Sequence, residues 1–284
     1  MNMTLKHYET ADTFLAQAQS YLEQNEAAAS LPLGIGLQLK HGTSPTESAP
    51  YFATVEDEQG MALVCLVTPP HNLVLYTDRE PDEDSLKLVA QDLIRRDQSI
   101  PGVVGTPLLA EAFAQIWAAS CDTTYNITMH QRIYALHSVN IPRSVNGHLR
   151  LATESDLNFL TPWYFGFISD TFGNPDQAVV QQAAQRHIAN KALYLWVDDE
   201  PVSMAMKTRA TAHGISISYV YTPPHFRRLG YASACVAALS QKLLDDGFDF
   251  CCLFTDLANP TSNAIYQKIG YEPVCDVNML HFED

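Results

Sequence analysis

A chain of 284 residues with 46% hydrophobic content is long enough for two ordinary domains and too apolar for wholesale disorder. Its 32 acidic and 17 basic side chains give a net charge of −15, which argues against nucleic acid and acidic membrane surfaces as partners. A surface of this sign could attract a cationic substrate, although good solubility is the simpler interpretation.

The cysteines and the N-terminus bear on the compartment and on metals. The six cysteines are scattered, and none belongs to a Cys-x-x-Cys pair or a Cys/His group at zinc spacing. We therefore expect no metal site, and we expect Cys251 and Cys252 to pack as small hydrophobic side chains. The chain begins without an apolar export segment, and no apolar run approaches bilayer length. These features predict a reduced, cytoplasmic, soluble protein.

The first half mixes helical and extended patterns of apolar residues. A Gly- and Pro-rich stretch over 31–50 is expected to be irregular, and 138–147 has the composition of a linker. In chain order we expect a helix over 11–29, strands over 51–55, 61–67 and 73–77, helices over 85–96 and 108–119, and a strand over 127–136.

The second half follows a similar order. Thr153 and Asp156 form a capping-box pattern that marks the start of a helix. In chain order we expect a strand over 148–152, this helix, a second helix over 176–189, strands over 193–197, 202–209 and 215–221, a helix ending near 246, a strand over 250–255, a helix over 260–269 and a strand over 272–281.

Short matches suggest that the two halves are copies of one fold. Val55-Glu-Asp-Glu58 is paralleled by Val197-Asp-Asp-Glu200, and Met61-Ala-Leu63 by Met204-Ala-Met206, in the same order. Repeats of this kind indicate a duplicated architecture.

One junction in the second half is suited to binding a phosphate. The strand over 215–221 stops at Pro223-Pro224, and a helical pattern begins just after Gly230. The first turn of a helix has backbone N–H groups without internal partners and a positive dipole end. Gly230 and Ala232 let an anion approach these groups, and Arg227 and Arg228 add positive charge. The turn therefore predicts a pyrophosphate site, with plain helix capping as the alternative.

A second motif follows downstream. Asn259 and the segment Asn263-x-x-Tyr266-x-Lys-x-Gly270-Tyr271 come after the turn in the expected order. Together the two stretches resemble the signatures of the GNAT superfamily of acyl-CoA-dependent N-acyltransferases, over residues 148–284. The resemblance implies acetyl-CoA as co-substrate and direct acyl transfer to an amine in a ternary complex.

The resemblance also implies a fold. We expect an α/β (α+β) protein with two GNAT-like domains, each a mixed, mostly antiparallel sheet flanked by helices. The boundaries would be 1–140 for a degenerate domain and 141–284 for the acyl-CoA-binding domain. The first copy lacks the Arg-x-x-Gly-x-Ala turn and has five carboxylates within 78–84, which would repel a pyrophosphate.

By this resemblance, the cofactor would be held by three groups of residues. Backbone groups of the strand before the turn would bind the pantetheine arm, the turn itself would bind the pyrophosphate, and two asparagines would contact the pantetheine or adenine end. These residues are Tyr219, Val220, Tyr221, Arg227, Arg228, Leu229, Gly230, Tyr231, Ala232, Ser233, Asn259, Asn263 and Tyr266. The alternative for the asparagines is that Asn259 caps the helix that starts at Pro260, which is compatible with binding. The strand over 215–221 should splay from its neighbour over 250–255 so that its backbone groups are exposed to the cofactor.

The proton-transfer groups are only partly predicted. Tyr266 occupies the position of the family's general acid, and a phenol with a pKa of about 10 is protonated at neutral pH. A purely structural tyrosine packed on the sheet is the alternative. The strand before the turn has no carboxylate for a general base, so water, Asp170, Asp256 or a residue of the first half remain candidates. The segment that usually lines the acceptor pocket contains Phe165, Phe167 and Phe172, which could equally be core.

Rival functions and the partner stay open. The acceptor could be a small-molecule amine or a protein amine, and nothing in the sequence gives the oligomeric state. A non-catalytic acyl-CoA-binding or sensor protein is the main alternative. A cysteine hydrolase using Cys251 or Cys252 is disfavoured because no glycine-rich elbow surrounds them.

Overall fold

A computed structural model describes residues 3–42, 48–141, 145–173 and 176–283. The first half contains β1 (Thr4–Tyr8), α1 (Ala11–Glu23), α2 (Ser30–Lys40), β2 (Tyr51–Asp57), β3 (Gly60–Val67), β4 (Leu73–Tyr76), α3 (Glu83–Arg95), β5 (Gly102–Gly105), α4 (Pro107–Cys121) and β6 (Thr124–Leu136).

The second half repeats this order of strands and helices and adds two short 3-10 turns. It contains β7 (His148–Leu151), the 3-10 turn η1 (Glu154–Asp156), α5 (Leu157–Phe172), α6 (Gln177–Ala189), β8 (Leu193–Asp198), β9 (Glu200–Ala210), β10 (Gly214–Tyr221), η2 (Pro224–Phe226), α7 (Tyr231–Asp245), β11 (Phe250–Asp256), α8 (Pro260–Ile269) and β12 (Glu272–Glu283).

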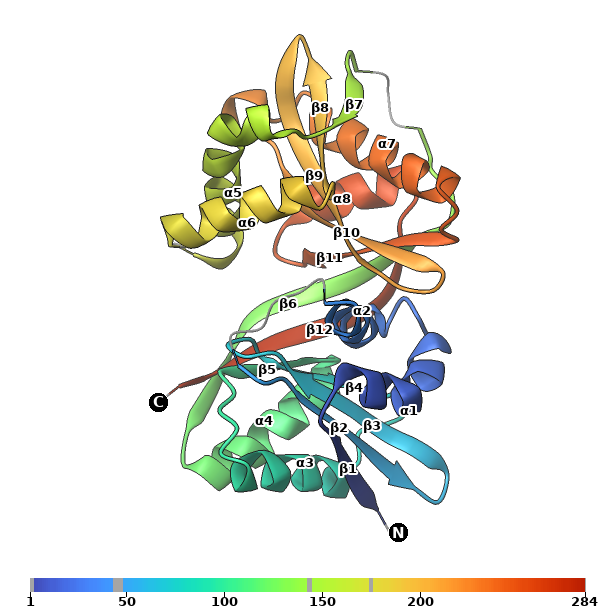
Figure 1. Cartoon of the computed structure of the whole chain (residues 1–284), viewed down its shortest axis with the longest axis vertical. Coiled ribbons are helices and arrows are strands. Elements are labelled where there is room, and N and C mark those ends of the chain that lie inside the picture. The colour runs from blue at the N-terminus through green and yellow to red at the C-terminus, as the bar shows by residue number, and fades with distance from the viewer. Residues whose placement is uncertain (1–2, 43–47, 142–144, 174–175, 284) are drawn as a thin grey trace.

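One continuous sheet joins the halves (Figure 1). Its strand order is β1-β2-β3-β4-β5-β12-β6-β11-β10-β9-β8-β7. Among the described strands only the pairs β4–β5 and β10–β11 are parallel, and each joins strands separated by a helix along the chain. The prediction of a mixed, mostly antiparallel sheet in two similar halves is confirmed.

The last strand of each half is exchanged. The strand β12, which ends the second half, pairs with β5 of the first half, and β6, which ends the first half, pairs with β11 of the second. The exchanged strands β6 and β12 also pair with each other, from Glu272–Ala135 to Glu283–Thr124. The predicted boundary at 140/141 lies in the connection between β6 and β7.

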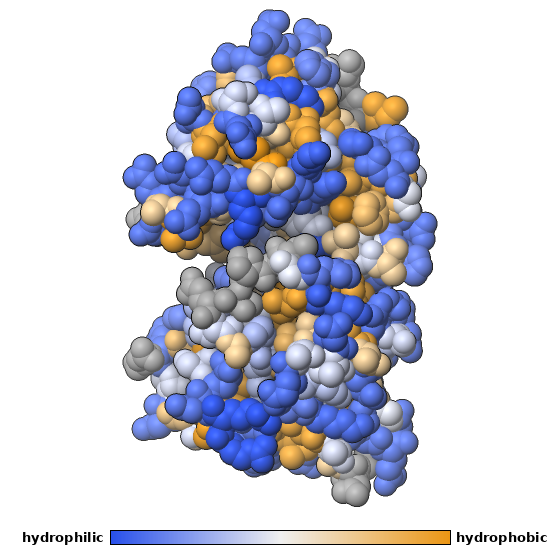
Figure 2. Space-filling view, viewed as in Figure 1, coloured by the Kyte–Doolittle hydropathy of each residue, from blue (hydrophilic) through white to orange (hydrophobic). Residues whose placement is uncertain are grey.

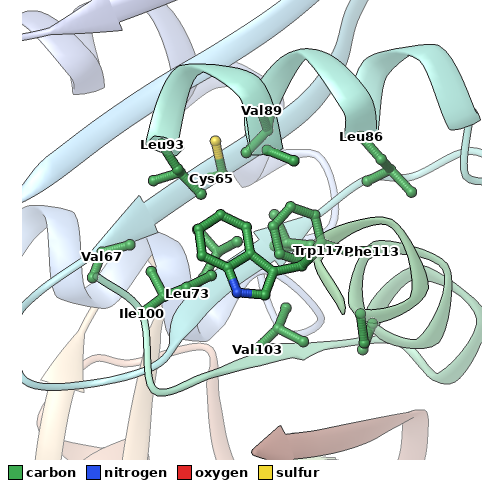
Figure 3. Close-up of a cluster of buried hydrophobic side chains, with 14 of the residues drawn as sticks. Cys65, Val67, Leu73, Leu86, Val89, Leu93, Ile100, Val103, Phe113 and Trp117 are labelled. Carbon is green, nitrogen blue, oxygen red and sulfur yellow. The ribbon is translucent and has the colours of Figure 1, made fainter. Parts of the chain in front are cut away.

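Helices cover both faces of each half. In the first half, α3 and α4 enclose a core around Trp117 and Phe113, which Figure 3 shows from close range, and α1 and α2 cover the opposite face. The exchange is visible in this core, because Leu280 and Phe282 of β12 belong to it. In the second half, α7 and α8 cover one face, and α5 and α6 cover the other.

The expected irregular stretch over 31–50 was wrong in its first part, because α2 is a helix from Ser30 to Lys40. Pro32 lies in the first turn, where its missing N–H costs no hydrogen bond. Gly34 is needed for packing: a Cβ there would lie 2.6 Å from the Cβ of Arg209 on β9. Close tertiary contact thus stabilises a helix whose glycines disfavour it locally.

Other differences are smaller. The helix expected over 11–29 ends at Glu23, and the short strands β1 and β5 were not predicted. The capping box of Thr153 and Asp156 is confirmed. Part of the predicted linker, 142–144, lies outside the described residues. Across the described ranges, every helix is too short or too polar to cross a bilayer.

Candidate functional site

The two parallel strands of the second half separate before they end. The strands β10 and β11 pair only at Gly214–Phe250, Ile215–Cys251 and Ser216–Cys252. Beyond these pairs, 217–221 of β10 and 253–256 of β11 have no ladder contact with each other. We call these two diverging segments the second-half fork. The predicted splay is confirmed.

A β-bulge increases the number of unpaired backbone groups on β10. The register against β9 shifts between Ser218–Met206 and Tyr221–Met204, and Tyr219 takes a left-handed φ of 51°. The Tyr219 ring packs on the α5 side, 4.7 Å from Phe167. Val220 packs on the α7 side. The backbone of these two residues therefore lies in the fork, and neither residue has a strand partner on β9.

The turn after β10 exposes the start of α7. Arg228 and Gly230 both have left-handed backbones, with φ of 67° and 91°. Gly230 is the N-cap and no side chain caps the helix, so the N–H groups of Tyr231, Ala232 and Ser233 have no partner from a capping side chain. Residues 227–230 are exposed. The helix N-terminus is therefore open, and such a position can accept an anion.

Neighbouring side chains tether this turn on both sides. The Arg227 Nε donates to the Thr222 carbonyl at 2.9 Å, and its Nη2 lies 2.7 Å from Asp170 of α5. The Tyr231 hydroxyl donates to Asp198 at 2.6 Å. Arg228 differs, because it is exposed and has no carboxylate partner among the described residues. Arg227 thus holds the turn, while Arg228 offers its charge to solvent.

Tyr266 lies in the buried cluster beneath the fork, with Val220 and Tyr231 packed against that cluster. Its ring meets the Tyr271 ring edge-on at 5.9 Å. Burial raises the pKa of Tyr266, so the phenol is protonated at neutral pH. No hydrogen bond of its hydroxyl is found among the described residues. The ring also packs in the core beside the sheet, as a purely structural tyrosine would.

The two predicted asparagines have structural bonds. Asn259 caps α8, its Oδ1 accepting from the Ser262 N–H at 3.0 Å, so the capping alternative is confirmed. The Asn263 amide donates to the carbonyls of Asp256 and Asn259, both at 2.8 Å, and its Oδ1 accepts from Tyr134 at 3.1 Å. These bonds hold α8 at the end of β11.

The candidate bases and acceptor-pocket residues are in different places. Asp170 is paired with Arg227 beside the turn, and Asp256 accepts from the Ala258 N–H at 2.8 Å. Phe167 stacks on Tyr219, whereas Phe165 and Phe172 are exposed on α5. Only Phe167 of the three aromatic residues therefore touches the fork.

Two contacts of the site were not expected from sequence. Tyr134, which bonds Asn263, belongs to the exchanged strand β6 and reaches the site only through strand pairing. Gly166 of α5 allows close approach to the fork, because a Cβ there would lie 2.3 Å from the Tyr221 hydroxyl. A glycine inside a helical pattern was the one signal that could have marked this contact.

The first half has its own fork. The strands β4 and β5 pair only at Leu73–Val103 and Val74–Val104. A cavity of about 300 Å³ lies there, with Tyr76, Thr77 and Gly105 in its wall. The following helix α3 is capped by the Asp82 carboxylate, which accepts from the Ser85 N–H at 2.9 Å. An anion is disfavoured at this position, where a carboxylate already satisfies the helix N-terminus.

The two adjacent cysteines of β11 belong to the core. Cys251 and Cys252 are buried as expected, and burial raises the pKa of the Cys251 thiol to about 12. Within the described part of the chain, no three His, Cys, Asp or Glu side chains cluster as metal ligands.

One family model matches part of the second half. The family model described as FR47-like protein matches residues 197–279, from the end of β8 into β12. No curated protein matches the sequence.

Solved structures match over nearly the whole chain. A protein of Drosophila has a TM-score of 0.69 at 12% identity, with 99% of each chain covered. A GCN5-related N-acetyltransferase from Sphaerobacter thermophilus has 0.62 at 14%, covering 99% of this chain and 95% of that one. A tandem GNAT protein from the clavulanic acid biosynthesis pathway has 0.55 at 13%, covering 99% and 98%. At these identities the likeness concerns the fold.

Proposed function

We propose that this chain, which has the GNAT fold in both halves, is a GNAT-superfamily N-acyltransferase that moves an acetyl group from acetyl-CoA to an amine. The observation that supports this best is the second-half fork followed directly by the open helix start at Gly230. A phosphate site and a strand gap at adjacent positions suit a long, anionic thioester. The first half would contribute packing and one wall of the acceptor site.

The turn would hold the pyrophosphate. Exposed N–H groups at the start of α7, the helix dipole and Arg228 all favour negative charge there. The fork would hold the pantetheine arm, whose amides can pair with backbone groups of Tyr219 and Val220 that the bulge leaves without a strand partner. The thioester would then lie near Val220, whose side chain contacts the cluster containing Tyr266.

The transfer needs one proton to leave and one to arrive. The amine nitrogen bonds to the acyl carbon, the carbon–sulfur bond breaks, and the departing thiolate takes the Tyr266 proton. The raised pKa of the Tyr266 phenol suits it to donate and not to ionise beforehand. Asp170 is paired with Arg227, so we assign the amine proton to water.

The test is a Tyr266→Phe variant. We expect the release of free CoA thiol from acetyl-CoA and an amine panel to fall by about 10²- to 10⁴-fold, the usual range for losing a general acid. Calorimetry should show that acetyl-CoA still binds. Mass spectrometry of the amine panel identifies the acetylated product and so the acceptor, small molecule or protein.

Two results would contradict the proposal. If the unmodified protein binds acetyl-CoA but no amine turns over, the protein is an acyl-CoA-binding or sensor protein. If activity disappears in a Cys251→Ser/Cys252→Ser double variant that still folds, a cysteine nucleophile replaces Tyr266 in the mechanism. We place the protein in the cytoplasm, which localisation of a tagged chain in cells would check.

A further inference from the structure

One partly buried cation near the second-half fork takes no part in the proposed acetyl transfer. Arg209, near the end of β9, is half-buried, and its Nε is buried without a hydrogen-bond partner in the described structure. The other described arginines are different. Arg186 and Arg228 are exposed, and the rest are within 4 Å of a carboxylate.

The position of Arg209 is fixed by the first half. The α2 helix presses on its aliphatic stem at Gly34, where any Cβ would lie 2.6 Å from the Arg209 Cβ. Burial lowers the pKa of the guanidinium, which remains charged because an arginine pKa is so high. The packing of α2 therefore holds the charge where solvation is poor, and the Phe254 ring, 5.9 Å from the guanidinium carbon, compensates for part of this.

Phe254 relates this charge to the fork. It lies two residues beyond Cys252, the last residue of β11 that pairs with β10. Cys252 and Phe254 point to one face of the sheet and Cys251 and Leu253 to the other, where α7 packs. The Arg209 guanidinium is therefore beside the fork, on the face opposite α7.

That face is the one from which an acceptor would come. If the cofactor enters along the start of α7, the amine must attack the thioester from the other face of the fork. There α2, α5 and α6 approach the sheet, and the space-filling view shows a notch between the two halves (Figure 2). Among the described residues no carboxylate lies within 4 Å of the Arg209 guanidinium, and its Nε has no hydrogen-bond partner, so the group can donate to a ligand.

We propose that Arg209 binds a negatively charged group of the acceptor, so that the substrates are amines carrying a carboxylate or phosphate. This inference rests on the proposed function and adds the substrate class to it. A guanidinium gives such a group two parallel charge-assisted hydrogen bonds. The ligand would also supply the counter-charge that the protein lacks at this position.

The first experiment compares matched acceptors. An α-amino acid and its carboxamide have the same amine, and an aminoalkyl phosphate provides the other anion. We expect kcat/KM for the preferred anion to exceed that for the neutral amide by about ten- to a hundredfold, and Arg209→Met to remove this preference while the value for the amide stays similar. Arg209→Lys should keep part of the preference for the anionic acceptor. An unchanged ratio in Arg209→Met would overturn the inference.

The second experiment does not depend on activity. Without ligand, Arg209→Met should melt at or above the temperature of the unmodified protein, because an unpaired buried charge is replaced by an apolar chain. Succinate or inorganic phosphate should raise the melting temperature of the unmodified protein and of an Arg186→Met control by more than that of Arg209→Met, in which the open start of α7 remains the one proposed anion site. If neither anion shifts the unmodified protein, Arg209 is not an anion site. If anions shift it as expected and no amine is acetylated, the proposed function fails and the binding site stands.

Discussion

The two forks of this protein have the same backbone plan and opposite chemistry. In each, a short parallel pair opens after two or three residue pairs, and a helix follows the first strand. After β10 the helix start is open, glycine-capped and flanked by Arg228. After β4 the helix start is closed by Asp82, and Asp78 is bonded to Tyr21 at 2.7 Å. The fold therefore provides a gap twice, and a few residues decide whether an anion can be bound there.

The largest effect on stability is expected from changes in the exchanged strands β6 and β12. Leu280 of β12 is buried in the first-half core and Leu136 of β6 in the second-half core. Either Leu→Ala change should lower the free energy of unfolding by about 2–5 kcal/mol. Native-state hydrogen exchange should show α3 and α4 weakened first by Leu280→Ala, and α7 by Leu136→Ala. The reverse pattern would mean that each half keeps its own last strand.

The next effect is at the turn. Gly230→Ala places a Cβ at φ 91° and 3.0 Å from the Val145 Cγ1, next to the proposed pyrophosphate site. Acetyl-CoA affinity by calorimetry should fall about tenfold or more, since a left-handed non-glycine residue costs about 1–2 kcal/mol and the turn would move. Gly247→Ala is the matched control, with φ 106° and open space around its Cβ. Equal losses of affinity in the two variants would remove the turn from the site.

A smaller effect is expected from charge alone. Arg228→Glu makes the charge beside the second-half helix start negative, as it is in the first half. Acetyl-CoA affinity should then fall several-fold, by about 1 kcal/mol for one exposed phosphate contact. The loss should shrink as salt is added. Arg186→Glu, equally exposed on α6, should leave affinity unchanged. If Arg228→Glu binds acetyl-CoA at low salt as tightly as the unmodified protein does, the charge of the turn does not explain the difference between the two forks.

The smallest effect concerns the contact between the halves. Glu26, between α1 and α2, accepts from the N–H groups of His213 and Gly214 at 2.9 and 3.2 Å and lies 2.8 Å from the His213 Nδ1. Burial alone would raise the pKa of Glu26, but hydrogen bonds from Thr211, His213 and Gly214 hold it below the ordinary 4.5. The bond to Glu26 raises the pKa of His213 above 6.5.

The signs give a pH window. The Glu26 contribution is present above pH 4.5 and is lost as the pH falls through its lowered pKa. The His213 contribution is present below pH 6.5 and is lost as the pH rises through its raised pKa. The melting-temperature difference between the unmodified protein and Glu26→Gln should therefore peak between these values. Glu58→Gln, on an exposed turn, should show no such peak.

Much of the second half was predictable because its motifs are local. The strand that stops at Pro223, the small residues of the turn and the cap at Asn259 each depend on neighbours a few positions away. The splay followed from the resemblance, and the pairing that ends at Ser216 confirmed it. The roles of the cofactor-binding residues and of Tyr266 stay predictions.

The features that the sequence did not predict depend on contacts between residues far apart in the chain. The α2 helix is stabilised against Arg209, a residue of the other half, and its Gly34 is unfavourable without that contact. Tyr134 reaches Asn263 only because β6 pairs with β11, and no periodicity in the sequence specifies which half a strand joins. Arg209 itself is an ordinary position in a strand pattern until its surroundings are known.

The exchange of β6 and β12 also determines how the protein can be divided. A cut between β6 and β7 separates two polypeptides that each lack the strand flanking their own parallel pair and each retain a strand meant for the other. Neither fragment should form a complete sheet by itself. Mixed together, they should assemble into a heterodimer with the full twelve-strand sheet, so a severed chain would act as a complementation pair whose recovery depends on concentration.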